Sequence, residues 1–180
     1  MAQLSVHDKA VLNCIFNPNL PLDQVYDEEL SAPIKDIEEE TPETEKSKEL
    51  EVEGVRKAED SKLDEAINLI NAAIRIAPNR ASPYNNRAQI NQLLGNLTDA
   101  FNDLTKAIEL GKDEQQRTTC QALCQRGLLY RKEGKIDLAR EDFNEAAKLG
   151  SHFAKNQLIE LNPYAALCNQ MLRQAFENLQ

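Results

Sequence analysis

Small and apolar residues recur at a fixed interval along the middle of the chain. Ala66 and Ala100 are 34 positions apart, and Ala139 follows Ala100 after 39 positions. Ala73 and Ala107 repeat the first spacing. Self-similarity with this period indicates a repeat protein, in which each copy is one supersecondary unit stacked on the next.

The three copies predict helix-turn-helix repeats at residues 47–80, 81–114 and 120–150. Small residues stand where the two helices of a repeat would cross closely, and larger apolar residues fill the spaces between them. The small positions are Gly54, Ala66, Ala88, Ala100, Gly127 and Ala139, and the large ones are Ile70, Leu104 and Phe143. This pattern is typical of tetratricopeptide repeats, so we predict an all-α, right-handed superhelix of three such repeats.

The copies differ in their turns and their spacing. Ser61 and Thr98 are predicted N-caps of the second helices of repeats one and two, because a hydroxyl can accept a bond from a free N–H group at a helix start. A five-residue insertion, within GKDEQQRTTC, precedes the third repeat. We expect it to lengthen the first helix of that repeat, from about Asp113 to Glu133.

Residues 151–180 predict helices that cap the last repeat, whose apolar end must be covered. The first carries Phe153, Leu158 and Leu161, and the second begins at Pro163 and runs through Met171 and Phe176.

The region before the repeats, residues 1–46, predicts a helix followed by a linker. Residues 5–16 predict a short amphipathic helix with apolar residues on one side: Val6, Ala10, Val11, Cys14 and Ile15. Residues 17–46 hold four of the seven prolines and most of the acids of this region, so we predict a poorly ordered linker.

Charge is concentrated in this first region. The chain carries a net charge of −9, of which −8 falls on residues 1–46. Neither part of the chain has a stripe of basic residues that could neutralise phosphates, so a nucleic acid partner is not expected. No apolar run is long enough to span a membrane, and the start of the chain lacks the basic residues of a signal peptide. We therefore expect a cytoplasmic protein, or a nuclear one.

Catalytic and metal-binding patterns are not found in the sequence. It contains neither GxxxxGK[ST] nor GxGxxG, and its acids cluster in a segment expected to be solvated. Cys120 and Cys124 share a helix face, but His7 and His152 are too distant in sequence to complete an evident zinc site. We expect ordinary thiols, no metal or cofactor, no small-molecule substrate and no enzyme.

Four segments, spread over nearly the whole chain, resemble the tetratricopeptide repeat protein 36 family. The resemblance rests on DKAVLNCIFNPNLP, SPYNNRAQ, QRGLL and LNPYAALCNQML. It implies a small cytosolic adaptor that binds proteins and that is linked to heat-shock chaperones, as many tetratricopeptide proteins are.

Many domains of this superfamily grip a C-terminal Glu-Glu-Val-Asp sequence with a carboxylate clamp of Lys, Asn and Arg side chains. Transferred position by position, the clamp falls on Glu51, Val55, Asn86, Gln121 and Gln125. Only Asn86 keeps the clamp residue, and Glu51 reverses the charge. We predict that this chain does not bind such a tail by the usual clamp, because Glu51 would repel it.

The expected groove is lined by amides instead. The candidate partner-binding residues are Asn85, Asn86, Gln89, Gln92, Gln121, Gln125 and Lys132. Amides both donate and accept hydrogen bonds, so they suit an uncharged backbone; a solvated polar face is the alternative. Arg87 and Arg126 occupy matching positions, and pairing with acids on adjacent helices is favoured over ligand contact.

Two functions remain open. The protein is either a chaperone-linked adaptor that uses a surface other than the clamp, or a dedicated stabilising or assembly scaffold for one target without a chaperone. The N-terminal helix either occupies the groove and gates it, or packs on the outer face or stays loose.

Overall fold

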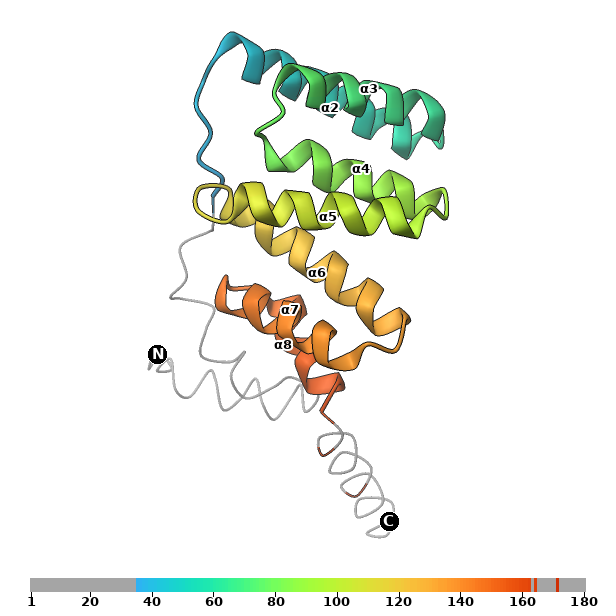
Figure 1. Ribbon diagram of the computed structural model, residues 1–180, viewed down its shortest axis with the longest axis vertical. Coiled ribbons are helices and arrows are strands. Elements are labelled where there is room, and N and C mark those ends of the chain that lie inside the picture. The colour runs from blue at the N-terminus through green and yellow to red at the C-terminus, as the bar shows by residue number, and fades with distance from the viewer. Residues whose placement is uncertain (1–34, 163, 165–170, 172–180) are drawn as a thin grey trace, which may run out of the picture. The chain divides into compact units, whose positions relative to one another are not determined.

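Helices form every regular element in the part of the chain that the computed structural model describes, which is residues 35–162 with Tyr164 and Met171. In chain order they are α2 (Pro42–Glu59), α3 (Leu63–Ile76), α4 (Ala81–Leu93), α5 (Leu97–Gly111), α6 (Gln116–Lys132), α7 (Ile136–Lys148) and α8 (His152–Glu160) (Figure 1). The prediction of an all-α fold is confirmed.

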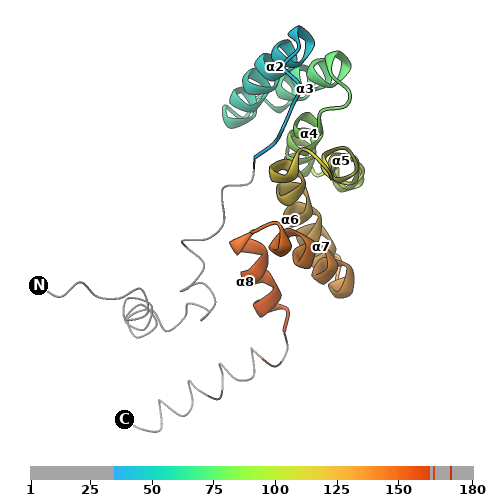
Figure 2. The ribbon, with the colours of Figure 1, turned by 90° about the vertical axis from the view of Figure 1, so that its left-hand side faces the viewer.

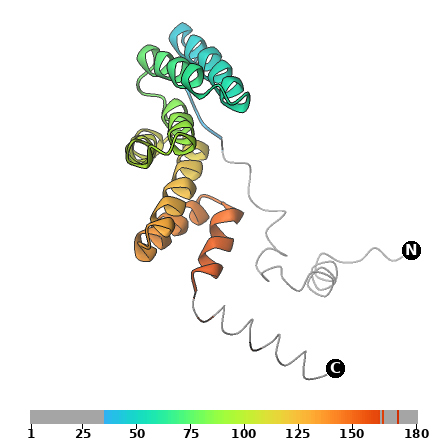
Figure 3. The same cartoon turned by 90° about the vertical axis from the view of Figure 1, so that its right-hand side faces the viewer.

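The helices form three pairs, α2 with α3, α4 with α5, and α6 with α7. The first helices also contact one another, α2 with α4 and α4 with α6. Figures 2 and 3 show α5 and α7 on the opposite side of the stack from α4 and α6. We call the outward surface of α2, α4 and α6 the first-helix face.

The predicted pairing of small and large residues forms the core. A Cβ atom on Gly127 would lie 2.8 Å from a ring carbon of Phe143, and one on Gly54 would lie 2.8 Å from the Ile70 side chain. These glycines therefore permit the close approach of the paired helices. All predicted core positions are buried: Gly54, Ala66, Ile70, Ala88, Ala100, Leu104, Gly127, Ala139 and Phe143.

Left-handed residues close α2, α4, α6 and α7. Their φ angles are 62° at Ser61, 81° at Gly95, 76° at Gly134 and 89° at Gly150. In the first turn the N–H of Lys62 donates to the carbonyl of Lys57 at 2.9 Å, the six-to-one bond of a Schellman motif. The predicted N-caps are wrong, because Ser61 belongs to this turn and Thr98 lies inside α5, whose N-cap is Asn96.

Arginine links neighbouring repeats. Arg126 donates two bonds to Asp142, at 2.9 and 2.7 Å, and a third to Thr105 of the preceding repeat at 3.2 Å. One repeat earlier, Arg87 makes the same two bonds to Asp103, at 2.9 and 2.6 Å, and reaches Asn71 at 2.8 Å. The prediction that these arginines pair with acids on adjacent helices is confirmed.

The insertion before the third repeat does not lengthen its first helix as predicted. α6 begins at Gln116, and the residues before it form a turn that ends in an isolated bridge between Gln115 and Asp36. The Gln115 side chain accepts a bond of 2.8 Å from the N–H of Ala81, at the start of α4. The turn is therefore held by tertiary contacts that a helix would break.

α2 begins earlier than the predicted repeat boundary at Ser47. Thr41 is its N-cap and accepts a bond of 3.2 Å from the N–H of Thr44, and Pro42 occupies the first helical position. Both residues favour a helix start. The prediction of a poorly ordered linker is wrong for residues 42–46, and residues 17–34 lie outside the described part.

α8 packs against α7 as the predicted cap of the last repeat. Phe153 meets Phe143 edge to face, with ring centroids 6.3 Å apart. Apart from Tyr164 and Met171, the predicted second capping helix lies outside the described residues, as does the predicted N-terminal helix. Within the described part, no helix has the length and apolar character needed to span a membrane.

Candidate partner-binding site

The first-helix face combines exposed amides with exposed apolar side chains. Gln89 and Leu93 are exposed on α4, with 67 % of Leu93 accessible to solvent. On α6, Gln121, Leu128 and Lys132 are exposed. Residues four apart lie on one helix side, so these residues form two parallel rows. Such a surface offers hydrogen bonds and apolar contact with little net charge.

Three amides of this face are joined to one another. Gln92 Nε2 donates to Gln125 Oε1 at 3.0 Å, and Gln125 Nε2 donates to Asn85 Oδ1 at 2.9 Å. Asn85 is only 2 % exposed, so it positions Gln125 from beneath. Of the predicted site residues, Gln89, Gln121 and Lys132 are those whose side chains are open to solvent.

Asn86, the single retained clamp residue, is bound within the protein. Its Nδ2 donates to Oε1 of Glu51 at 2.6 Å, and the hydroxyl of Ser82 donates to the same oxygen. Arg80 pairs with the other oxygen of Glu51 at 2.9 Å. Glu51 is 7 % exposed, so this carboxylate lies inside the fold, at the position where the clamp would carry a lysine.

A short segment before α2 completes this cluster. We call residues 35–41 the strap. Glu38 of the strap pairs with Arg80 and with Lys48, each at 3.0 Å. Arg80 also donates to the Ser47 hydroxyl at 2.9 Å. Arg80 thus binds the strap and α2 together beside α4.

The strap continues to the start of α6. Asp36 accepts bonds from the N–H and the hydroxyl of Thr118, at 3.0 and 2.7 Å, and the N–H of Ile37 donates to the Glu114 carbonyl at 2.8 Å. The sequence alone does not predict these contacts. The TPET sequence signals the start of α2, but nothing in the sequence indicates which acid meets α6.

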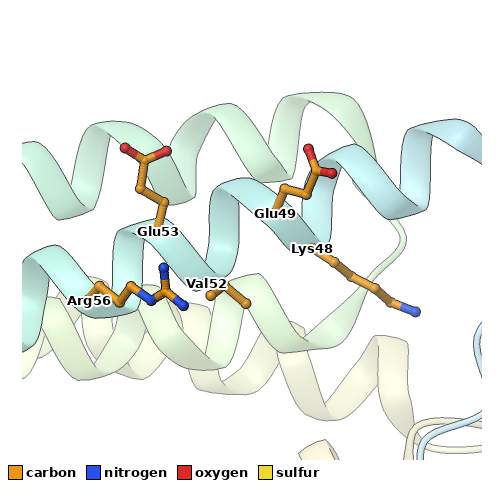
Figure 4. A pocket seen from close by; sticks show the side chains of 5 residues that line it. All are labelled: Lys48, Glu49, Val52, Glu53 and Arg56. Carbon is orange, nitrogen blue, oxygen red and sulfur yellow. The ribbon is translucent and has the colours of Figure 1, made fainter.

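A shallow depression of about 610 Å³ lies on α2 (Figure 4). It is lined by Lys48, Glu49, Val52, Glu53 and Arg56, and Val52 is 52 % exposed. One repeat length later, Pro83 and Ile90 take the places of Glu49 and Arg56 and are buried, so the depression lies on a side of α2 whose counterpart in α4 is packed inside the fold. Its rim carries both charges, whereas the rows on α4 and α6 are mainly uncharged.

Comparison with known proteins places the chain in a family. It is 49 % identical to the Tetratricopeptide repeat protein 36 homolog of Drosophila melanogaster, over 98 % of this chain and 96 % of that protein. The chain belongs to the tetratricopeptide repeat protein 36 family. It is also 48 % identical to Tetratricopeptide repeat protein 36 of Danio rerio, over 97 % of this chain and 94 % of the relative. The sequence model described as "Tetratricopeptide repeat" matches residues 81–113 and 121–149.

The fold has solved counterparts. The first TPR of Spaghetti (RPAP3) bound to an HSP90 peptide, SRMEEVD, matches with a TM-score of 0.58 and 23 % identity, over 68 % of this chain and 95 % of that domain. The chain is thus an all-α tetratricopeptide solenoid, and its repeats form a scaffold for protein–protein interaction.

Proposed function

We propose that this protein is a chaperone-linked adaptor of the cytoplasm that binds a heat-shock chaperone or its client through the first-helix face, without a carboxylate clamp. The observation that carries the proposal is the internal pairing of Asn86 with the buried Glu51. The amide that would hold a partner's carboxylate is already engaged by a carboxylate of the chain itself.

Electrostatics oppose an acidic tail at this position. The Glu51 carboxylate is already paired with Arg80 and bonded to Asn86, and Gln121 and Gln125 are neutral where the clamp has cations. A carboxylate gains most from charge-assisted donors, and these positions provide none. The first-helix face instead suits an uncharged segment that presents apolar side chains to Leu93 and Leu128 and backbone groups to Gln89 and Gln121.

The link to a chaperone is supported by the similar solved domain that carries an HSP90 peptide. The same loss of clamp residues supports a second candidate, a dedicated stabilising or assembly scaffold for one target protein, with no chaperone involved.

Calorimetric titration of the full chain with a cytosolic DnaK-type heat-shock chaperone, intact and lacking its last four residues, tests the proposal. Binding that survives the truncation supports an adaptor without a clamp. Binding that is lost on truncation contradicts the proposed surface. If the chain binds neither form of the chaperone, the dedicated scaffold becomes the favoured function.

Two leucines of equal exposure identify the surface. Leu128 on α6 and Leu138 on α7 are each 41 % exposed, but only Leu128 lies on the first-helix face. We expect Leu128→Asp to weaken binding of the chaperone, or of the target if one is isolated, by about tenfold or more, which is about 1.4 kcal/mol. Leu138→Asp should leave the affinity unchanged. Equal losses for both variants would argue against the first-helix face.

A further inference from the structure

Two thiols and a hydroxyl meet where α6 approaches the start of α8. Cys120 and Cys124 are both free thiols one helical turn apart on α6. Cys120 is buried and its sulfur lies 3.6 Å from the Ala146 carbonyl, whereas Cys124 is half-buried and its sulfur lies 3.3 Å from Oγ of Ser151. Cys124 lies on α6 between Gln121 and Leu128 of the first-helix face, but the proposed binding surface uses neither thiol.

The Ser151 hydroxyl lies within hydrogen-bond distance of the Cys124 sulfur. Its oxygen already accepts a bond of 3.1 Å from the N–H of Ala154, because Ser151 is the N-cap of α8. The hydroxyl hydrogen therefore remains for the sulfur of Cys124. The same contact places this sulfur beside the N-terminal end of α8, where the helix dipole favours a negative charge.

The neighbouring groups favour a Cys124 thiolate. The thiol of Cys120 contributes most and the Ser151 hydroxyl adds to it; together they lower the pKa of Cys124 to about 7, although burial acts in the opposite direction. The pKa of Cys120 is raised by the same contact with Cys124 and by its own burial. At neutral pH, Cys124 is thus the nucleophile of the pair and Cys120 stays protonated.

Solvent can reach Cys124. Gln121 and Leu128 lie three residues before it and four residues after it, and both are exposed, so Cys124 lies on the accessible side of α6.

We propose that Cys124 is a site of reversible thiol oxidation, with a hydroperoxide as the oxidant. The thiolate sulfur attacks one peroxide oxygen, the O–O bond breaks, and the leaving alkoxide or hydroxide takes a proton from water. A sulfenic acid forms, so the sulfur loses two electrons and the peroxide gains them.

Geometry disfavours a following disulfide with Cys120. Side chains four apart on a helix have Cβ atoms about 5–6 Å apart. A disulfide needs about 3.5–4.5 Å, so the bond would require α6 to distort. We therefore expect the sulfenic acid to persist until an external thiol attacks it, which forms a mixed disulfide and releases water.

The test begins with the full-length wild-type chain. Alkylation by iodoacetamide is followed between pH 5 and 10, and fragmentation spectra separate the two cysteines, which share the tryptic peptide 118–126. We expect Cys124 to react at least about tenfold faster than Cys120 at neutral pH, with its rate half-maximal near pH 7. A midpoint at or above the ordinary value of about 8.5, or equal rates, would overturn the proposal.

Variants then test the cause. Ser151→Ala and Cys120→Ala should each move the midpoint for Cys124 upward, and Ser151→Thr, which keeps a hydroxyl, should restore it. If Ser151→Ala does not fold, Cys120→Ala still tests the proposal, and an unmoved midpoint in the folded variant counts against it.

The oxidation itself is tested with tert-butyl hydroperoxide. The wild-type chain should gain one oxygen at Cys124, and dimedone should trap the resulting sulfenic acid. Loss of two hydrogens with no trapped product would refute the sulfenic acid.

Discussion

Ser61 shows how one residue departs from the repeat. It closes α2 at φ 62°, where the equivalent turns of the next two repeats carry glycines, Gly95 at 81° and Gly134 at 76°. The left-handed conformation costs a residue with a Cβ atom about 1–2 kcal/mol, and glycine avoids that cost. Part of this gain is lost, because a chain with glycine at this position is more flexible when unfolded and loses more conformational entropy on folding.

Ser61→Gly should therefore stabilise the protein by about 0.5–1 kcal/mol, measured by urea unfolding. The matched change Gly95→Ser should destabilise it by a similar amount. A loss of stability in Ser61→Gly would mean that the exposed serine makes a contact that outweighs its backbone strain.

At the scale of the element, a small residue of the first helix packs against a large residue of the second helix in each pair. Gly127 lies against the ring of Phe143, whereas in the middle pair Ala88 and Leu104 occupy the equivalent positions and are fully buried. The rigid ring leaves no room for a methyl group, because a Cβ would lie 2.8 Å from it.

Gly127→Ala should destabilise the protein by about 1–3 kcal/mol, although alanine favours a helix over glycine. Adding Phe143→Leu, which reproduces the pair of repeat two, should recover part of this loss, so that the two changes are not additive. Thermal unfolding of wild type, both single variants and the double variant measures the coupling. Simple additivity would show that the ring does not limit the space at Gly127.

At the scale of the whole molecule, the strap connects helices that are distant in sequence. α4 and α6 have no side-chain cap from their own N-cap residues. Gln115 bonds the first N–H of α4, and Asp36 bonds the N–H of Thr118 in the first turn of α6. Both helix starts are thus satisfied by residues from other parts of the chain.

Asp36→Ala should cost about 1 kcal/mol, the usual loss for an N-cap side chain. Because Ile37 lies next to it and bonds Glu114, amide exchange at Ile37 should also accelerate. Glu39→Ala, at an exposed neighbour, is the control and should change neither quantity. If the Ile37 amide exchanges in Asp36→Ala as it does in wild type, the strap is held by Glu38 and Arg80 alone.

The helix pairs and their core could be predicted from the amino-acid sequence alone. The alanine spacing and the small-to-large pairing are periodic, and a period can be recognised in one chain. The two repeat arginines, Arg87 and Arg126, could be assigned to structure for the same reason. Glu51 could also be recognised as incompatible with a clamp, because the clamp positions follow the repeat.

The partners of the polar groups that do not follow the repeat could be found only in the folded chain. Asp36 lies 82 positions from Thr118, and Glu51 lies 35 from Asn86. Such pairs depend on how distant segments approach, and a polar side chain has no local signal for its partner. The same reason explains the insertion before the third repeat. Its sequence predicts a helix, but the residues before Gln116 form a turn, because Gln115 bonds the first N–H of α4 and pairs with Asp36 of the strap.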